Sequence, residues 1–486
     1  DGHEEYFLDK RKERGYNLSD YGAVFPLLWQ YKDEVKTMAQ AFFGGVHPND
    51  MKAATNEKAI EQLQAPAQVV IPMSMHFGAP CTPTVSKGDY VKLGQKIGEF
   101  KGLGAPIHAS VSGTVAAVEP RPYSMGGKVM SVVIDNDFKD DLSEEVHAPA
   151  DPDALSVEEM VEMVKQAGIV GMGGATFPTH VKYAPQSSGR IIDTVILNGI
   201  ECEPFITADY RILLEHADEV IRGLKYFLKA SLANKGIIAI EDNKPRAIEL
   251  FNQLTADDPN ISVVVCPEKY PQGSERHLIY AVTGRVVPER ALPSAIGVIV
   301  DNVATAMQAA LAVKDDLPCY ERIVTVSGNA VHKPGNYRVR IGTLYSHLVE
   351  QGAQGLKNDP ARIISGGPMM GFSLHSLDFP VLKGTGGLLL FDHQSELAKL
   401  PPENPCVRCG KCVDTCPMFL EPTQLFKAVK RRDWPAALAG HVGTCIECGS
   451  CAYNCPAHIP LVQYIRMGKQ FILTDGFGGH NPYYKK

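Results

Sequence analysis

Between residues 156 and 315 the hydrophobic pattern alternates between two periods. Compact apolar runs typical of buried strands occupy residues 191–197, 236–240 and 261–266. Stretches with apolar residues at helical spacing separate or follow them, at residues 209–228, 244–254 and 303–313. Ser156 and Glu159 have the spacing of a capping box, which predicts that a helix begins after Ser156. Strands that alternate with helices favour an α/β layer around a mainly parallel sheet.

The flanking regions have a different pattern. From residue 69 to 133, and again from 322 to 390, short apolar-polar alternations lie between glycines, which predicts short strands and tight turns. The last hundred residues combine cysteines with short amphipathic stretches such as residues 420–432. We therefore expect a multi-domain α/β and β chain that ends in a helical, cysteine-rich domain.

Length and charge restrict the function. At 486 residues the chain is long enough for about three domains. A net charge of −7 argues against nucleic acid as a partner, because nucleic-acid binding requires a basic face. No stretch reaches about 18 uninterrupted apolar residues, and the polar residues 1–37 contain no signal peptide, so we expect neither a spanning helix nor secretion. Residues 1–37 are an extension that no pattern explains.

The cysteines are the strongest chemical signal. Eight of the 12 lie in two copies of the spacing C-x2-C-x2-C-x3-C-P, at 406, 409, 412 and 416 and at 445, 448, 451 and 455. Three closely spaced thiolates surround one cubane cluster, and the fourth, before proline, reaches the other cluster. The spacing predicts two [4Fe–4S] clusters: cluster 1 on Cys406, Cys409, Cys412 and Cys455, and cluster 2 on Cys445, Cys448, Cys451 and Cys416. The alternative is a pair of structural zinc sites, which need only paired cysteines.

Two further segments carry candidate chemistry. The glycine loop, Gly171-Met-Gly-Gly-Ala-Thr176, precedes Phe177 and Lys182 and could present backbone N–H groups to a phosphate, or be a plain turn. The acidic segment, residues 198–209, places Glu201 and Glu203 after a strand, at the edge where α/β sheets bind ligands. From spacing alone these carboxylates could also be a general acid/base pair or a solvated turn.

Both segments carry a family resemblance. The glycine loop with Lys182 resembles the G-x-G-G-A-G-F-P-T-G-x-K motif of the flavin- and NADH-binding subunit of respiratory complex I. The acidic segment is similar to that family's N-A-D-E-G-E-P, and residues 270–276 and 300–305 look like its next two flavin motifs. Phe43-Gly-Gly-Val-His-Pro48, the barrel-sandwich pattern of residues 85–95 and 107–115, and the terminal cysteine repeat resemble the RnfC family, which belongs to the Rnf ion-translocating ferredoxin:NAD oxidoreductase complex.

The resemblance covers about residues 40–470 and implies a domain order. After the extension at 1–37 we expect a barrel-sandwich domain at 38–150, lipoyl-like but without a carrier lysine, because the hairpin at Lys101 is too short. A Rossmann-like FMN/NADH domain follows at 151–318. A soluble-ligand-binding β-grasp module spans 319–395, and an α-helical two-cluster ferredoxin domain with a C-terminal tail spans 396–486. Residues 366–371 (Gly-Gly-Pro-Met-Met-Gly) are expected to form a turn that contacts another domain.

The resemblance also implies site residues. FMN would be held by Gly171, Gly173, Gly174, Lys182, Asn198, Glu201, Tyr270, Gly273 and Asn302. NADH would stack on Phe177 and meet Glu203 and Glu275. This chain departs from the family at Thr176 for glycine, Ser274 for glutamate and Asp301 for asparagine, changes expected to tune nucleotide contacts.

The implied function is an oxidoreductase subunit that exchanges electrons between NAD(H), FMN and two [4Fe–4S] clusters. Its partners would be the other Rnf subunits, including an iron–sulfur subunit, with ferredoxin acting indirectly, and no nucleic acid. It would lie peripherally on the cytoplasmic face of the bacterial inner membrane. The alternatives are a flavin and iron–sulfur cobalamin reductase of a microcompartment, or a wiring subunit with an inactive flavin domain.

Overall fold

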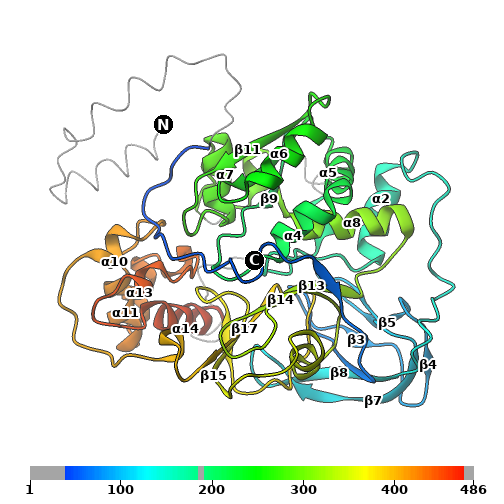
Figure 1. The fold of residues 1–486 in the computed structure, drawn as a ribbon. Helices are drawn as coiled ribbons and strands as arrows, with labels where there is room; N and C mark the ends of the chain where they lie inside the picture. Colours follow the sequence, from blue (N-terminus) through cyan, green and yellow to red (C-terminus); the bar gives the residue numbers. More distant parts are fainter. Residues whose placement is uncertain (1–38, 184–190, 290, 475–486) are drawn as a thin grey trace. The chain divides into compact units, whose positions relative to one another are not determined.

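A computed structural model describes residues 39–183, 191–289 and 291–474 (Figure 1). The N-terminal extension and the C-terminal tail of the sequence prediction lie outside this described part. Within it, strands, an α/β layer, a second sheet and a group of helices follow one another in chain order, as the sequence predicts. In the described part of the chain, no helix combines the length and the apolar character that a membrane crossing requires.

The first module consists of two small antiparallel sheets. One has the order β2-β8-β7-β4, from β2 (Gln68–Pro72), β4 (Tyr90–Val91), β7 (Gly113–Pro122) and β8 (Lys128–Asn136). The other has the order β3-β5-β6, from β3 (Thr82–Pro83), β5 (Lys96–Glu99) and β6 (Ile107–His108). Ile71, Ile97, Ile107 and Val132 are fully buried between them, so the apolar alternation of the sequence does form a sandwich core.

The α/β layer contains a four-stranded sheet in which every pairing is parallel, as predicted. Its strands are β9 (Thr194–Gly199), β10 (Lys235–Glu241), β11 (Ile261–Cys266) and β12 (Val298–Asn302), in the order β11-β10-β9-β12. The chain adds β10 and β11 on one side of β9 and then returns to place β12 on the other. This reversal beside β9 is a topological switch point, the place where open α/β sheets bind ligands beyond the strands' carboxyl ends.

Helices cover both faces of this sheet. Val195, Leu197, Ile238 and Ile240 share a core with helices α2 (Val157–Gln166), α5 (Ala217–Ser231), α6 (Pro245–Leu254) and α8 (Val303–Asp315). Alternate residues, including Ile196 and Ile237, pack against α7 (Glu275–Thr283) on the opposite face. The capping box at Ser156 forms, with the Glu159 N–H donating to Ser156 Oγ.

The helix expected over residues 209–228 is two helices. The structure has α4 (Ala208–Glu215) and α5, which begins at Ala217, and His216 between them has φ −131°. Both halves are amphipathic, so their period matches one long helix. The break depends on a single residue whose side chain makes contacts beyond the helix: Arg338 donates to His216 Nε2 at 2.6 Å.

The third module is a six-stranded mixed sheet of order β1-β14-β13-β17-β15-β16. Its strands are β1 (Ile60–Gln62), β13 (Glu321–Ser327), β14 (Gly335–Arg340), β15 (Pro360–Ser365), β16 (Phe372–Leu374) and β17 (Gly387–Asp392). Strand β1 comes from far upstream in the chain and pairs in parallel with β14. The chain between residues 39 and 62 thus belongs spatially to the second and third modules.

The last module is helical. It contains α10 (Lys411–Asp414), α11 (Pro422–Lys430), α12 (Trp434–Ala439), α13 (Ser450–Tyr453) and α14 (Leu461–Thr474). The amphipathic stretch predicted at 420–432 is α11, which buries Leu425 and Val429 against Ile465 of α14. Each cysteine run ends in one of the two short helices, α10 and α13.

Candidate functional site

The carboxyl ends of β9 and β12 bring two predicted flavin residues side by side. Asn198 and Asn302 are register partners in the parallel pair. Asn198 Nδ2 donates to the Gly273 carbonyl at 2.8 Å, and Asn302 Nδ2 donates to Asp209 Oδ2 at 2.6 Å. A Cβ atom on Gly173 would lie 3.4 Å from Asn302 Cβ, so the glycine loop approaches this end of the sheet. Residues from four distant segments therefore meet at the switch point.

The glycine loop is shaped by its own backbone. Gly171 N–H donates to the Phe177 carbonyl at 2.8 Å, and Thr176 N–H donates to the Gly171 carbonyl at 3.1 Å. Gly173 and Gly174 are exposed, and Gly174 has φ +114° with open space where a side chain would stand. Thr176, which replaces a family glycine, adopts φ +49°, in the left-handed region that favours glycine. The loop therefore keeps a glycine-like conformation at this position despite the substitution.

Lys182 is close to the loop but is already paired. Its Nζ donates to Asp301 Oδ1 and to the Val300 carbonyl, each at 2.7 Å, and Tyr183 Oη donates to the other oxygen of Asp301 at 2.6 Å. Asp301 is the residue that replaces a family asparagine. Its carboxylate therefore neutralises much of the positive charge that Lys182 would offer to a phosphate.

Glu201 is a buried carboxylate at the start of α4. It has φ +53°, and its carboxylate accepts the backbone N–H of Asp209 at 2.6 Å and of Tyr210 at 3.2 Å. Burial raises the pKa of Glu201 to about 7, although the nearby Lys52 ammonium lowers it. Such a group can gain or lose a proton near neutral pH at the edge of the predicted flavin site.

Two buried lysines that the sequence reasoning did not identify hold this edge together. Lys52 Nζ donates to the carbonyls of Glu201 at 2.8 Å, Glu203 at 3.0 Å and Ile206 at 2.5 Å. Lys244 Nζ donates to the Ile200 carbonyl at 2.6 Å and to Glu241 Oε2 at 3.0 Å. Each is a single lysine outside any motif, so nothing in the sequence separates it from a surface lysine.

Glu203, a predicted NADH contact, is held by another module. The N–H groups of Met369 and Met370 donate to its two carboxylate oxygens at 3.0 and 2.9 Å. Tyr270 Oη lies 3.4 Å from Glu203 Oε1. Burial raises the pKa of Glu203 to about 7, and the two backbone donors act in the opposite direction. The turn at 366–371 thus contacts the α/β layer, as expected of it.

The predicted nicotinamide side of the site borders the barrel-sandwich domain. Phe77 N–H donates to the Thr176 carbonyl at 2.9 Å, and the Phe77 and Phe177 ring centroids are 5.9 Å apart. Phe77 is 55% exposed. Glu275, the other predicted NADH contact, begins α7 and is exposed. Two aromatic rings and a carboxylate therefore lie around the glycine loop.

Orphaned polar atoms test whether a flavin nucleotide fits. Gln272 and Thr179 are fully buried, yet Gln272 Nε2 and Oε1 and Thr179 Oγ1 have no hydrogen-bond partner among the described residues. Buried polar groups are normally paired, so such atoms mark places for a polar ligand. Gln272 adjoins Gly273, and Thr179 follows the glycine loop. The residues present therefore fit a phosphate-bearing, hydrogen-bonding cofactor.

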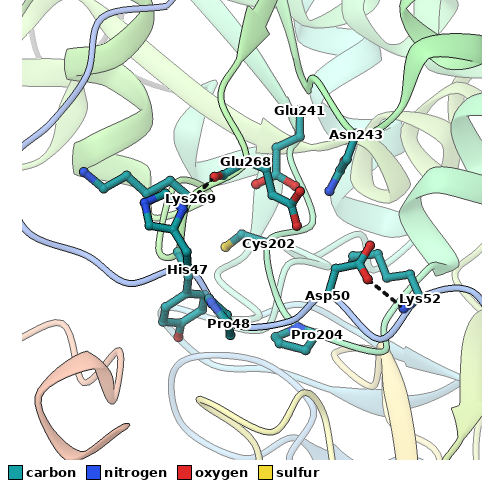
Figure 2. A pocket seen from close by; sticks show the side chains of 11 residues that line it. His47, Pro48, Asp50, Lys52, Cys202, Pro204, Glu241, Asn243, Glu268 and Lys269 are labelled. Atoms are coloured by element: carbon teal, nitrogen blue, oxygen red, sulfur yellow. Dashed lines mark hydrogen bonds between the residues drawn. The ribbon is translucent and has the colours of Figure 1, made fainter. Parts of the chain in front are cut away.

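A separate small cavity lies beside the acidic segment (Figure 2). Its volume is about 170 Å³, below the range of roughly 300–1,000 Å³ that is usual for cofactor pockets. Among the described residues, its lining comes from the N-terminal strap (residues 39–62) and the carboxyl ends of β10 and β11, without the glycine loop: His47, Pro48, Asp50, Lys52, Cys202, Pro204, Glu241, Asn243, Glu268, Lys269 and Tyr270. Tyr270 is the one predicted flavin residue in this lining, so the cavity is largely separate from the predicted flavin site.

The cluster 2 cysteines surround one cavity. Cys416 lines it together with Cys445, Cys448 and Cys451, the grouping that the spacing predicts. Burial raises the pKa of Cys416 to about 11 and that of Cys445 to about 12. Buried thiols held together in this way favour a ligand that binds thiolates and compensates their charge, as an iron–sulfur cluster does.

The cluster 1 cysteines are closer to solvent. Cys406 and Cys409 are exposed, Cys412 is buried and Cys455 is intermediate. The pKa of the Cys412 thiol is raised by burial and, to a smaller extent, by the thiols of Cys455 and Cys409. Cys455 therefore lies near the first run, which supports the predicted exchange of the fourth ligand.

The cluster 2 side of this module contacts the α/β layer. Tyr270 Oη donates to the Cys448 carbonyl at 2.7 Å, and His277 Nε2 donates to the Pro417 carbonyl at 3.1 Å. Gly45 N–H donates to the Thr415 carbonyl at 2.9 Å. Tyr270 is a predicted flavin residue and Cys448 a predicted cluster ligand, so a single hydrogen bond joins the two predicted sites.

Comparison with known families assigns each module. The Nuo51 FMN-binding domain matches residues 164–311, and the RnfC barrel sandwich hybrid domain matches residues 40–139. The SLBB domain matches residues 323–373, and a 4Fe-4S dicluster domain matches residues 404–459. The predicted order of modules is confirmed at this level.

A relative over nearly the whole chain decides the family. The RnfC protein of Acetobacterium woodii, from its Na(+)-translocating ferredoxin:NAD(+) oxidoreductase complex, is 44% identical over 434 residues, which cover 89% of this chain and 97% of that protein. This chain belongs to the RnfC family. The RnfC protein of Clostridium ljungdahlii, from a proton-translocating ferredoxin:NAD(+) oxidoreductase complex, is 44% identical over 80% of this chain and 84% of its own length.

Solved structures give a weaker likeness. An NAD+-reducing [NiFe]-hydrogenase in the H2-reduced state is 18% identical with a TM-score of 0.45, over 69% of this chain and 63% of that one. The air-oxidised state of such an enzyme gives 21% identity and a TM-score of 0.46, over 66% and 64%. At these TM-scores the likeness establishes no shared fold for this RnfC chain.

Proposed function

We propose that this RnfC chain exchanges electrons between NAD(H) and two [4Fe–4S] clusters through FMN. NADH gives up two electrons together as a hydride, whereas each cluster takes one at a time, and a flavin is the group that handles both. The match to an FMN-binding domain and to a 4Fe-4S dicluster domain within one RnfC chain supports this combination. No side chain has to act as an acid or base in the transfer.

The residues have distinct tasks in this proposal. FMN would be held by Gly171, Gly173, Gly174, Lys182, Asn198, Glu201, Tyr270, Gly273 and Asn302. The exposed glycine N–H groups would bind the phosphate, and Asn198 and Asn302 would place the ring system at the switch point. Phe177, Glu203 and Glu275 would orient the nicotinamide nucleotide. Lys52, which holds the carbonyls of the acidic segment, would keep Glu201 and Glu203 in position.

One observation carries the order of the route. Tyr270, at the flavin edge, donates a hydrogen bond to the backbone carbonyl of Cys448, a cluster 2 ligand. Cluster 2 would therefore exchange electrons with the flavin, and cluster 1, on exposed Cys406 and Cys409, would exchange them with a partner. We place that partner among the other subunits of the complex, as an iron–sulfur subunit that receives electrons from ferredoxin. The chain would lie peripherally on the cytoplasmic face of the membrane.

Flavin release and an electron-transfer assay test this function. Acid precipitation of the full chain should release FMN into the supernatant, and the intact chain should pass electrons from NADH to ferricyanide. It should not couple ferredoxin oxidation to NAD+ reduction by itself, because that step is assigned to the assembled complex. Release of FAD, or a chain with FMN that NADH cannot reduce, would contradict the proposal, and the second result would favour a wiring subunit with an inactive flavin domain.

A further inference from the structure

The turn at residues 366–371, here named the Met turn, is a junction of three modules. It belongs to the third module, between β15 and β16. On one side Met369 and Met370 reach Glu203 of the α/β layer. On the other side the Met369 carbonyl lies 3.0 Å from the point where a Cβ on Gly449 would stand. Gly449 follows Cys448, so the Met turn contacts both the predicted nucleotide carboxylate and the cluster 2 loop.

The grip on Glu203 is specific. Each carboxylate oxygen accepts one backbone N–H, at 3.0 Å from Met369 and 2.9 Å from Met370. Hydrogen bonds to a carboxylate are among the stronger ones in proteins. An ionised carboxylate has about four acceptor sites, so two N–H donors fix its plane and still leave acceptor capacity for a ligand. The Met turn therefore orients Glu203 without using it up.

The contact on the cluster side is packed. Val46, Tyr270 and Cys448 form one buried apolar group, against which Met369 and Cys202 pack. Tyr270 is 1% exposed and donates to the Cys448 carbonyl. Met369 thus packs against the group that contains both partners of the hydrogen bond joining the flavin edge to cluster 2, and a shift of the turn must disturb that bond or its packing.

Gly367 explains why the turn needs a glycine at this position. A Cβ atom there would lie 2.1 Å from Glu203 Oε2 and 2.4 Å from Glu203 Cδ. No side chain fits unless Glu203 or the turn moves. The turn is closed by a further bond, from Gly371 N–H to the Gly367 carbonyl at 2.9 Å.

We propose that the Met turn is a positioning element that couples the nucleotide site to cluster 2. It holds the Glu203 carboxylate for the nicotinamide nucleotide, and it holds the Cys448 loop against Tyr270. The inference rests on the proposed function, because it assumes that NADH reduces a flavin beside Glu203 and that cluster 2 receives the electrons. The third module, which supplies none of the predicted cofactor ligands, thereby acquires a role in the reaction.

Gly367→Ala is the direct test. Its matched control is Gly386→Ala in the same module, where a Cβ would lie 3.7 Å from the Arg322 guanidinium, an ordinary contact. In the full, reconstituted chain, Gly367→Ala should raise KM for NADH about tenfold, the loss expected for one charged hydrogen bond. In stopped-flow traces it should also slow cluster reduction after flavin reduction by a similar factor. FMN content should equal that of Gly386→Ala.

A second pair removes a donor instead of adding bulk. Met370 is 43% exposed, and its contact with Glu203 is through its backbone N–H. Met370→Pro deletes that N–H, whereas Met370→Ala keeps it. We expect Met370→Pro to reproduce both effects of Gly367→Ala and Met370→Ala to behave as wild type. This pair keeps the test decisive if Gly367→Ala fails to fold.

The outcomes separate the two proposals. If wild type reduces its flavin with NADH but Gly367→Ala and Met370→Pro match their controls, the positioning role is wrong and the proposed function stands. A rise in KM without slower cluster reduction would also overturn the coupling, because Glu203 would then act on the nucleotide alone. If wild type itself binds FMN and cannot be reduced by NADH, the proposed function fails first.

Discussion

The ferredoxin module and the α/β layer hold their predicted cofactors in opposite ways. All eight cluster cysteines lie within 50 residues of chain, and the cavity that Cys416 shares with the second run is the one that the spacing predicts. The α/β site collects its groups from the strap at Lys52, the turn at Phe77, the glycine loop, three strand ends and the Met turn. A site encoded by local spacing can be read from one motif, whereas a site assembled by topology needs the fold.

The two sites also differ in what supports them. Cluster ligands are held by the short helices that the motifs themselves form. The carboxylates Glu201 and Glu203 are held by groups from other segments, namely Lys52, the α4 backbone and the Met turn. We therefore expect single substitutions in the ferredoxin module to have all-or-none effects on one cluster, and substitutions around the α/β site to have graded effects.

The largest effect is expected at a cluster ligand. Cys416→Ser should abolish cluster 2, which is formed mainly by the other run, and leave cluster 1 largely intact, because the fourth ligands are exchanged. Cys202→Ser, outside the runs, is the control and should keep both clusters. Electron paramagnetic resonance with iron analysis would show which signal disappears. Loss of the cluster on Cys406, Cys409 and Cys412 would contradict the exchange.

Next in size is the loss of a buried fastening. Lys52→Met leaves three carbonyls without their donor and Glu201 without its nearby cation, so the free energy of unfolding should fall by about 3–5 kcal/mol. The control is Lys58→Met in the same strap, where the lysine is exposed, and it should change stability by roughly 0.5 kcal/mol or less. Urea denaturation measures both. Equal losses would show that Lys52 is an ordinary strap residue.

A pH dependence follows from Glu203. Burial raises its pKa from 4.5 to about 7, so between these values the folded chain binds more protons than the unfolded chain. Its contribution to stability must then fall as pH rises through this range, by up to about 3 kcal/mol. Glu203→Gln removes the titration, so the variant should start less stable and lose less stability as pH rises from about 5 to 8. Parallel curves for the two proteins would be inconsistent with this.

The smallest effect concerns the barrel-sandwich wall. Phe77 lies beside Phe177, so Phe77→Ala should remove aromatic surface next to the stacked nucleotide and raise KM for NADH several-fold, about 1 kcal/mol. Phe138→Ala, at a residue 58% exposed on the same domain, is the control. Steady-state ferricyanide reduction gives both values. If the two variants agree, the first module has no part in nucleotide binding.

The sequence predicted the modules and their periods because each depends on local pattern. The parallel sheet, the capped helix at Ser156 and the strand at 261–266 all follow from short-range alternation or spacing. It did not predict that His216 divides a helix or that β1 joins the third module's sheet. It also did not predict that Asp301 captures Lys182. These features depend on contacts between residues more than 100 positions apart, which no window along the sequence contains.

The central claim is that NADH delivers electrons through the flavin to cluster 2 and then to cluster 1. Rapid freeze-quench paramagnetic resonance of the anaerobic, reconstituted chain after mixing with NADH tests it most directly. Cys416→Ser serves to assign the signals. We predict that the cluster 2 signal appears before the cluster 1 signal, and that in Cys416→Ser the flavin is reduced while cluster 1 stays oxidised on that timescale. Reduction of cluster 1 at the wild-type rate in Cys416→Ser would contradict the account.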